Sequence, residues 1–179
     1  FLRERLEAAG PGVAVVGEEA GGERADALWY VDPIDGTSNF AHGHPWFCVS
    51  LGLWEGGRPV CGVVHAPALG LTYAAARGRG VTRNGVAVRA SSTTDLSRAL
   101  LASGFPSDRA TRVPSPYPAF VQLDRASHGI RRCGAAALEL SLVADGAYDG
   151  FWELGLQAWD LAAGVLFVQE AGGTVTDLS

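Results

Sequence analysis

The sequence has 179 residues, of which 47% are hydrophobic, and a formal net charge of −5. The length fits one domain, and the hydrophobic content excludes a disordered or acidic activation segment. The negative charge argues against a nucleic-acid-binding surface, and the longest apolar run, residues 161–168, is too short for a membrane-spanning helix of roughly 20 residues.

Short apolar segments separated by glycine or proline turns alternate along the chain, and longer apolar stretches at helical spacing follow in the last third. The expected strands are residues 13–16, 28–31, 46–54, 58–66, 71–76, 86–89, 99–103, 148–152 and 174–176. The expected helices are residues 1–9, 37–40, 135–144 and 161–171. This mixture predicts a layered α/β or α+β sandwich.

Two boundaries in this scheme are specific expectations. The second strand should stop at Asp32, because Pro33 follows directly. The stretch between Pro106 and Pro118 contains four prolines, which predicts an exposed loop. The three cysteines, Cys48, Cys61 and Cys133, have no paired spacing, which predicts free thiols and a cytoplasmic protein.

Acidic residues follow the ends of the predicted strands. Glu18 and Glu19 come after the first strand, Asp32 and Asp35 after the second, and Asp160 begins the last helix. Adjacent residues at a strand end point to opposite sides, so of the first pair we expect only Glu18 at the site. Carboxylates that meet at low dielectric repel each other unless a cation lies among them, and oxygen ligands favour Mg²⁺ or Mn²⁺.

The segment at residues 32–37 combines several of the groups that such a site needs. Pro33 stiffens the turn between the two aspartates, and Ile34 can turn its carbonyl toward a metal. Gly36 permits close approach of the backbone to a ligand, and Thr37 begins a short helix whose free N–H groups favour a phosphate. A lone Asp before a helix is often only a cap, but this combination favours a metal and phosphate site.

Four segments resemble the inositol monophosphatase family: residues 17–19, 32–40, 159–164 and 170–173. The resemblance implies a layered αβαβα sandwich and a Mg²⁺-dependent, lithium-sensitive phosphatase that is usually a homodimer. It implies an inositol-1-monophosphatase, which releases phosphate from a small phosphorylated polyol or sugar by attack of metal-activated water. Because family segments at both ends have no counterpart here and Met is absent, we expect residues 1–179 to be one phosphatase domain of a longer protein.

The resemblance also implies roles for individual residues. The metal ligands for two or three Mg²⁺ ions, or Mn²⁺ in their place, would be Glu18, Asp32, the carbonyl of Ile34, Asp35 and Asp160. The catalytic residues would be Glu18, Thr37 and Asp35, with the first two orienting the attacking water. The phosphate and substrate contacts would be Asp35, Gly36, Thr37, Gly134, Ala135, Ala136, Glu153 and Asp160.

Other functions remain open at this point. The same fold could serve a fructose-1,6-bisphosphatase or a 3′-phosphonucleotide phosphatase, and Ala135 stands where relatives often carry Ser or Thr. An aspartate-nucleophile phosphatase needs two aspartates one residue apart, whereas two residues separate Asp32 from Asp35. A non-catalytic regulatory binding protein is disfavoured, because clustered buried carboxylates are costly without a metal.

Overall fold

The computed structural model of the chain describes residues 1–10, 12–18 and 25–177. The helices are α1 (Leu2–Ala9), α2 (Thr37–Ala41), α3 (Tyr117–Ala126), α4 (Ala136–Ala144) and α5 (Ala158–Glu170), with the 3₁₀ turns η1 (Pro67–Leu69) and η2 (Leu96–Arg98). The strands are β1 (Ala14–Gly17), β2 (Ala27–Asp35), β3 (Cys48–Glu55), β4 (Arg58–Ala66), β5 (Leu71–Ala76), β6 (Val81–Arg83), β7 (Val86–Val88), β8 (Leu100–Ser103), β9 (Gly129–Arg131) and β10 (Gly150–Trp152).

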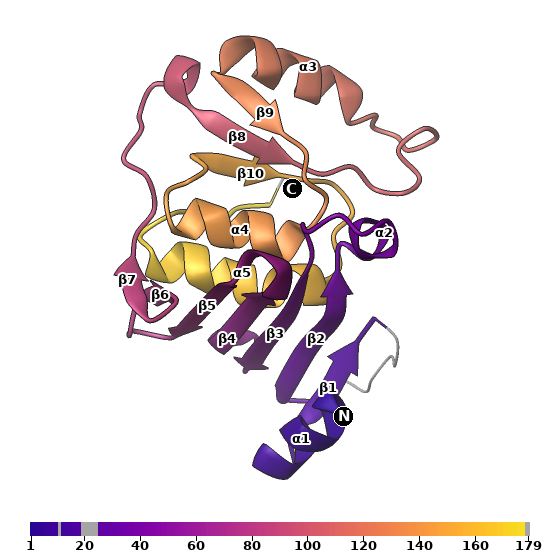
Figure 1. Cartoon of the computed structure of the whole chain (residues 1–179), viewed down its shortest axis with the longest axis vertical. Coiled ribbons are helices and arrows are strands. Elements are labelled where there is room, and N and C mark those ends of the chain that lie inside the picture. Colours follow the sequence, from indigo (N-terminus) through magenta and orange to yellow (C-terminus); the bar gives the residue numbers. More distant parts are fainter. Residues whose placement is uncertain (11, 19–24, 178–179) are drawn as a thin grey trace.

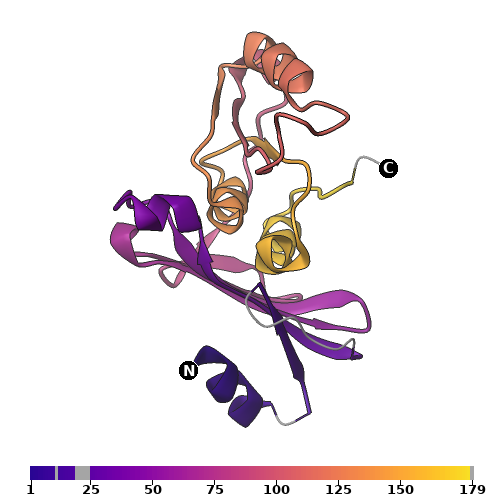
Figure 2. The ribbon, with the colours of Figure 1, turned by 90° about the vertical axis from the view of Figure 1, so that its right-hand side faces the viewer.

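The elements form alternating layers. The seven-stranded sheet has the order β1-β2-β3-β4-β5-β6-β7, in which β1 and β2 are parallel and the other neighbours antiparallel. Helices α4 and α5 cover one face of it, the parallel sheet β10-β8-β9 lies beyond them, and α3 is outermost (Figure 1). Helix α1 lies on the opposite face of the large sheet (Figure 2). The expected αβαβα order is confirmed. Within the described ranges, no helix is both long and apolar enough to cross a membrane.

Glycines and alanines bring α5 close to the large sheet. A Cβ added at Gly52 would lie 2.7 Å from the Cβ of Ala162, and one added at Gly62 would lie 3.1 Å from the Cα of Ala163. Gly164, on α5 itself, allows the same close approach to α4. The helix therefore packs almost directly on the backbone of β3 and β4, and this contact places its first turn.

The structure differs from the expected elements in four places. Strand β2 continues to Asp35 instead of stopping at Asp32, because the ladder with β3 shifts register there. Most of the proline-rich stretch is an exposed loop, as expected, but its last residues begin α3, which has Pro118 in its first turn, where a missing N–H is harmless. Residues 174–176 form no strand. The three-residue strands β6 and β9 were missed because they are too short to show an alternating pattern.

Gly52→Ala should lower the free energy of unfolding by about 1–3 kcal/mol, because the added methyl group overlaps α5. Urea denaturation measures the loss. Gly10→Ala is the matched control, since its Cβ would lie 3.4 Å from Cγ2 of Val13, an ordinary contact. Equal stability of the two variants would contradict the close approach of α5.

Candidate active site

Asp32 and Asp35 end β2 on the same face of the sheet. Side chains alternate along a strand, so residues three apart normally face opposite sides. Asp32 pairs with Ser50 and Asp35 with Cys48, so β2 uses one residue more than β3 over this interval. This bulge turns both carboxylates toward α4 and α5, where they are 3% and 7% exposed.

Asp35 connects the end of β2 to the beginning of α4. Its Oδ1 accepts the N–H of Ala136 at 3.2 Å, and its Oδ2 accepts the N–H of Ala137 at 2.8 Å. The thiol of Cys48 donates to the same Oδ2 at 3.4 Å. Ala135, at the N-cap position of α4, has no polar side chain, so Asp35 caps this helix from another element. Burial raises the pKa of Asp35 to about 6, although the N–H of Ala137 opposes that rise.

Asn39 joins the segment after β2 to the loop before α4. Its Nδ2 donates to the carbonyl of Trp46 at 2.7 Å and to the carbonyl of Cys133 at 2.7 Å. Gly36 precedes α2 with a φ of 85°, and a Cβ there would lie 2.9 Å from the oxygen of Trp46. Only glycine fits this conformation and this space, so the turn and the loop hold one fixed arrangement.

Four carboxylates interact electrostatically at this end of the sheet. Burial and, to a smaller extent, the charges of Asp35, Glu18 and Asp160 raise the pKa of Asp32 to about 7, although the N–H of Ile34 opposes that rise. Glu18 follows β1 and is exposed, whereas Asp160 lies in the first turn of α5. Oδ2 of Asp160 accepts the N–H of Gln157 at 2.7 Å, which fixes this carboxylate at the start of the helix. The charges of the other three acids therefore act on Asp32, whereas the convergence of all four as metal ligands stays a prediction.

Glu153 follows β10 and belongs to the same acidic region. Burial, then the charges of Asp160 and Asp35, raise its pKa to about 7, while the charge of Arg132 lowers it. A side chain at Gly104 would overlap the carboxylate of Glu153, so that glycine leaves room for it.

Glu139 is a fully buried acid in α4 that the sequence analysis did not single out. Its Oε1 accepts the N–H of Cys133 at 2.9 Å, while its Oε2 has no hydrogen-bond partner in the part of the chain that the structure describes. Burial raises its pKa to about 8, which favours the neutral acid at neutral pH. Glu139 therefore supports the loop that Asn39 holds from the other side.

The donor chemistry fits a hard divalent cation. Asp32 and Asp35 supply buried carboxylates whose charged forms a cation would stabilise. The carbonyl of Ile34 accepts the hydroxyl of Thr37 at 2.9 Å and keeps a second lone pair. In the described parts of the chain, no three His, Cys, Asp or Glu side chains lie close enough together to hold a metal ion.

Several predicted roles stay predictions. The hydroxyl of Thr37 engages Ile34, and its expected pairing with Glu18 is untested. Gly134 is exposed at a φ of 80°, whereas Ala135 and Ala136 are buried beside Asp35. Glu19 lies outside the described residues. The acidic groups and the turn lie around α4 and α5, and their roles in metal and substrate binding stay predictions.

Ser50 and Cys48, together with Glu139, were missed by the sequence reasoning. Ser50 and Cys48 occupy inward positions of β3, and alternation in residues 48–52 could have placed them on one face with the small Gly52. A charged residue within the apolar stretch 136–144 was the signal for Glu139.

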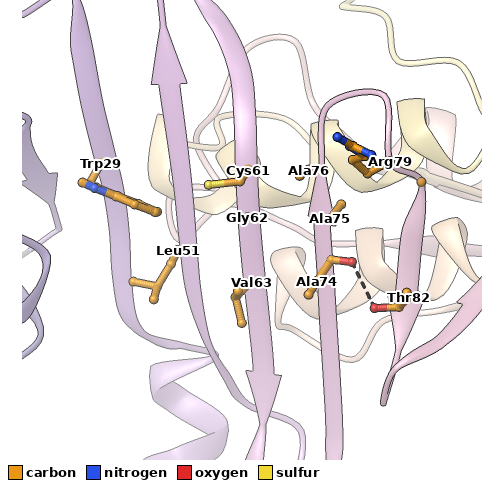
Figure 3. Close-up of a pocket in the computed structure, with 11 residues that line it drawn as sticks. Trp29, Leu51, Cys61, Gly62, Val63, Ala74, Ala75, Ala76, Arg79 and Thr82 are labelled. Atoms are coloured by element: carbon orange, nitrogen blue, oxygen red, sulfur yellow. Dashed lines mark hydrogen bonds between the residues drawn. The ribbon is translucent and has the colours of Figure 1, made fainter. Parts of the chain in front are cut away.

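An apolar hollow of about 380 Å³ lies on the other face of the large sheet, away from α4 and α5 (Figure 3). Trp29, Leu51 and Val63 project into it from neighbouring strands. None of the acidic residues above lines this hollow. A larger hollow of about 530 Å³ borders Glu153, between α5, β10 and residues 172–177.

A sequence model of the inositol monophosphatase family matches residues 1–179. Nus factor SuhB of Pseudomonas aeruginosa is 46% identical over 97% of this chain and 67% of its own length. Inositol-1-monophosphatase of Synechocystis is 42% identical over 93% of this chain and 59% of its own length.

The fold comparison agrees. The solved inositol monophosphatase from Anabaena (Nostoc) has a TM-score of 0.92 and 41% identity, over 94% of this chain and 68% of that one. The chain belongs to the inositol monophosphatase family, a family of phosphatase enzymes. It spans about three fifths of the length of the Synechocystis relative.

Asn39→Asp should lower the free energy of unfolding by about 1–3 kcal/mol, because a carboxylate would replace an amide donor between two carbonyl oxygens. Chemical denaturation at neutral pH measures the loss. Asn39→Ala removes the donor without adding charge and should lose no more than the aspartate variant. An aspartate variant as stable as the parent would contradict the role of Asn39 in joining the segment after β2 to the loop before α4.

Proposed function

We propose that the protein containing this chain is a Mg²⁺-dependent phosphomonoesterase whose substrate is inositol 1-phosphate. The observation that carries the proposal is the pair of buried aspartates that the bulge in β2 turns toward one face. Two comparisons support the substrate class. The Synechocystis relative is named inositol-1-monophosphatase, and a solved structure with 30% identity and a TM-score of 0.82 is titled as SaIMPase-II with bound inositol monophosphate.

In this proposal, the residues of the site have the following roles. The cation ligands would be Glu18, Asp32, Asp35, Asp160 and the carbonyl of Ile34. Mg²⁺, when bound, would supply activation of the attacking water and neutralisation of charge on the phosphoryl oxygens and the leaving oxygen. The backbone N–H groups of Gly36 and Thr37 would donate hydrogen bonds to phosphate oxygens. Thr37 and Glu18 would orient the water, and Glu153, with the loop at residues 134–136, would contact substrate hydroxyls.

A regulatory binding role is the second candidate. The observation in its favour is the name Nus factor SuhB, which the Pseudomonas aeruginosa relative carries in place of a phosphatase name. Partner binding that is equal with Mg²⁺ and with a chelator, in a protein without phosphate release, would favour this role.

The remaining expectations are of the same kind. Inhibition by lithium, a homodimeric assembly and a cytoplasmic location are proposed for this protein on its family membership. The three cysteines are free, as a cytoplasmic location would require.

Asp32→Asn should reduce Mg²⁺-dependent phosphate release by more than about 100-fold, because a lost metal ligand costs more than the ~10–100-fold of a lost ligand partner. The assay compares inositol 1-phosphate, fructose 1,6-bisphosphate and a 3′-phosphonucleotide, each with Mg²⁺ and with a chelator, on the whole protein. Asp124→Asn, on the exposed surface of α3, is the matched control. Parental activity in the Asp32 variant would overturn the assignment of Asp32 as a metal ligand. The compound that is hydrolysed fastest defines the substrate specificity of the protein.

A further inference from the structure

Ser50 has a fully buried hydroxyl that has no hydrogen-bond partner among the described residues. Buried hydroxyl groups in proteins are nearly always paired, so an unpaired one needs a reason. The reason lies in its surroundings, because Asp32, an acid of the candidate site, is its direct neighbour on the adjacent strand.

Ser50 pairs with Asp32 in the antiparallel ladder of β3 and β2. Residues that face each other in such a ladder point to the same side, with Cβ atoms about 4.5–5.5 Å apart. Both side chains are buried on the side of α4 and α5, 0% and 3% exposed. The backbone N–H of Ile34 already donates to Oδ1 of Asp32 at 3.0 Å.

The next inward residue of β3 shows what such a pairing does. Cys48 lies two positions from Ser50 and pairs with Asp35. Its thiol donates to Oδ2 of that aspartate at 3.4 Å. Strand β3 therefore offers one polar hydrogen to each of the two aspartates on β2, and only the bond from Cys48 is formed.

We propose that Ser50 is a positioning residue, whose hydroxyl donates to the carboxylate of Asp32 when that carboxylate binds a divalent cation. The proposal rests on the metal site of the proposed function. A charged carboxylate has about four lone-pair positions, so it can accept from Ile34 and Ser50 and still bind a cation. Two donors on one carboxylate restrict its rotation, and carboxylates that bind metals are usually held in this way.

A purely structural role for Ser50 predicts that cation affinity does not depend on its hydroxyl. If the side chain only fills space, replacing it by alanine leaves cation affinity unchanged. Because the hydroxyl has no hydrogen-bond partner among the described residues, its removal also costs no hydrogen bond within the described chain.

The test measures Mn²⁺ binding to the whole protein by electron paramagnetic resonance, with thermal unfolding in a chelator beside it. Ser50→Ala should raise the dissociation constant for Mn²⁺ by about 10–100-fold and leave the cation-free melting temperature unchanged or higher. Ser141→Ala is the matched control, since Ser141 is equally buried but donates to the carbonyl of Ala137 at 2.7 Å. It should melt earlier in chelator and bind Mn²⁺ as the parent does.

The outcomes separate the two proposals. Parental Mn²⁺ affinity in Ser50→Ala, with binding by the parent, overturns the role of Ser50 and leaves the metal site standing. No Mn²⁺ binding by the parent protein overturns the metal site itself and the role of Ser50 with it.

Discussion

The hydrogen bonds between the carboxylate of Asp35 and the first N–H groups of α4 are the contact on which this site depends. They join the end of the large sheet to the helix layer, at a helix that has no cap of its own. Because both oxygens are engaged, the orientation of the carboxylate is set before any ligand arrives. The loop at residues 133–135 is held at the same time by Asn39 and Glu139, so sheet, helix and loop form one unit.

The carboxylates of the acidic region repel one another, and the rest of the fold offsets this repulsion only in part. Burial and neighbouring carboxylates raise the pKa values of Asp32 and Glu153 to about 7. Nearby Arg132 opposes this rise at Glu153 only in part. Apolar side chains at the same interior positions would make the protein more stable than these acids do. A cation bound at this site, as proposed above, would offset that loss of stability.

Local patterns in the sequence predicted much of this architecture. The strands at residues 58–66 and 71–76 have the predicted bounds, because alternation and turn residues specify them locally. The bulge that turns Asp32 and Asp35 to one face was not predictable, since it depends on the register with β3. The partners of Asp35 were missed for the same reason: Ala136 and Ala137 lie about a hundred residues further along the chain.

The two sheets differ in how far apart their strands lie in sequence. Strands β2 to β7 follow one another as antiparallel neighbours, so each can pair with the one before it through a short connection. Strands β8, β9 and β10 are parallel, and their connections pass through α3 and α4. Parallel pairing over such distances is slow, because a long loop must close, at a cost in chain entropy, before the strands form stabilising contacts. The meander would therefore form first, and Glu153, which follows β10, would join the acids of β2 only at the last stage of folding.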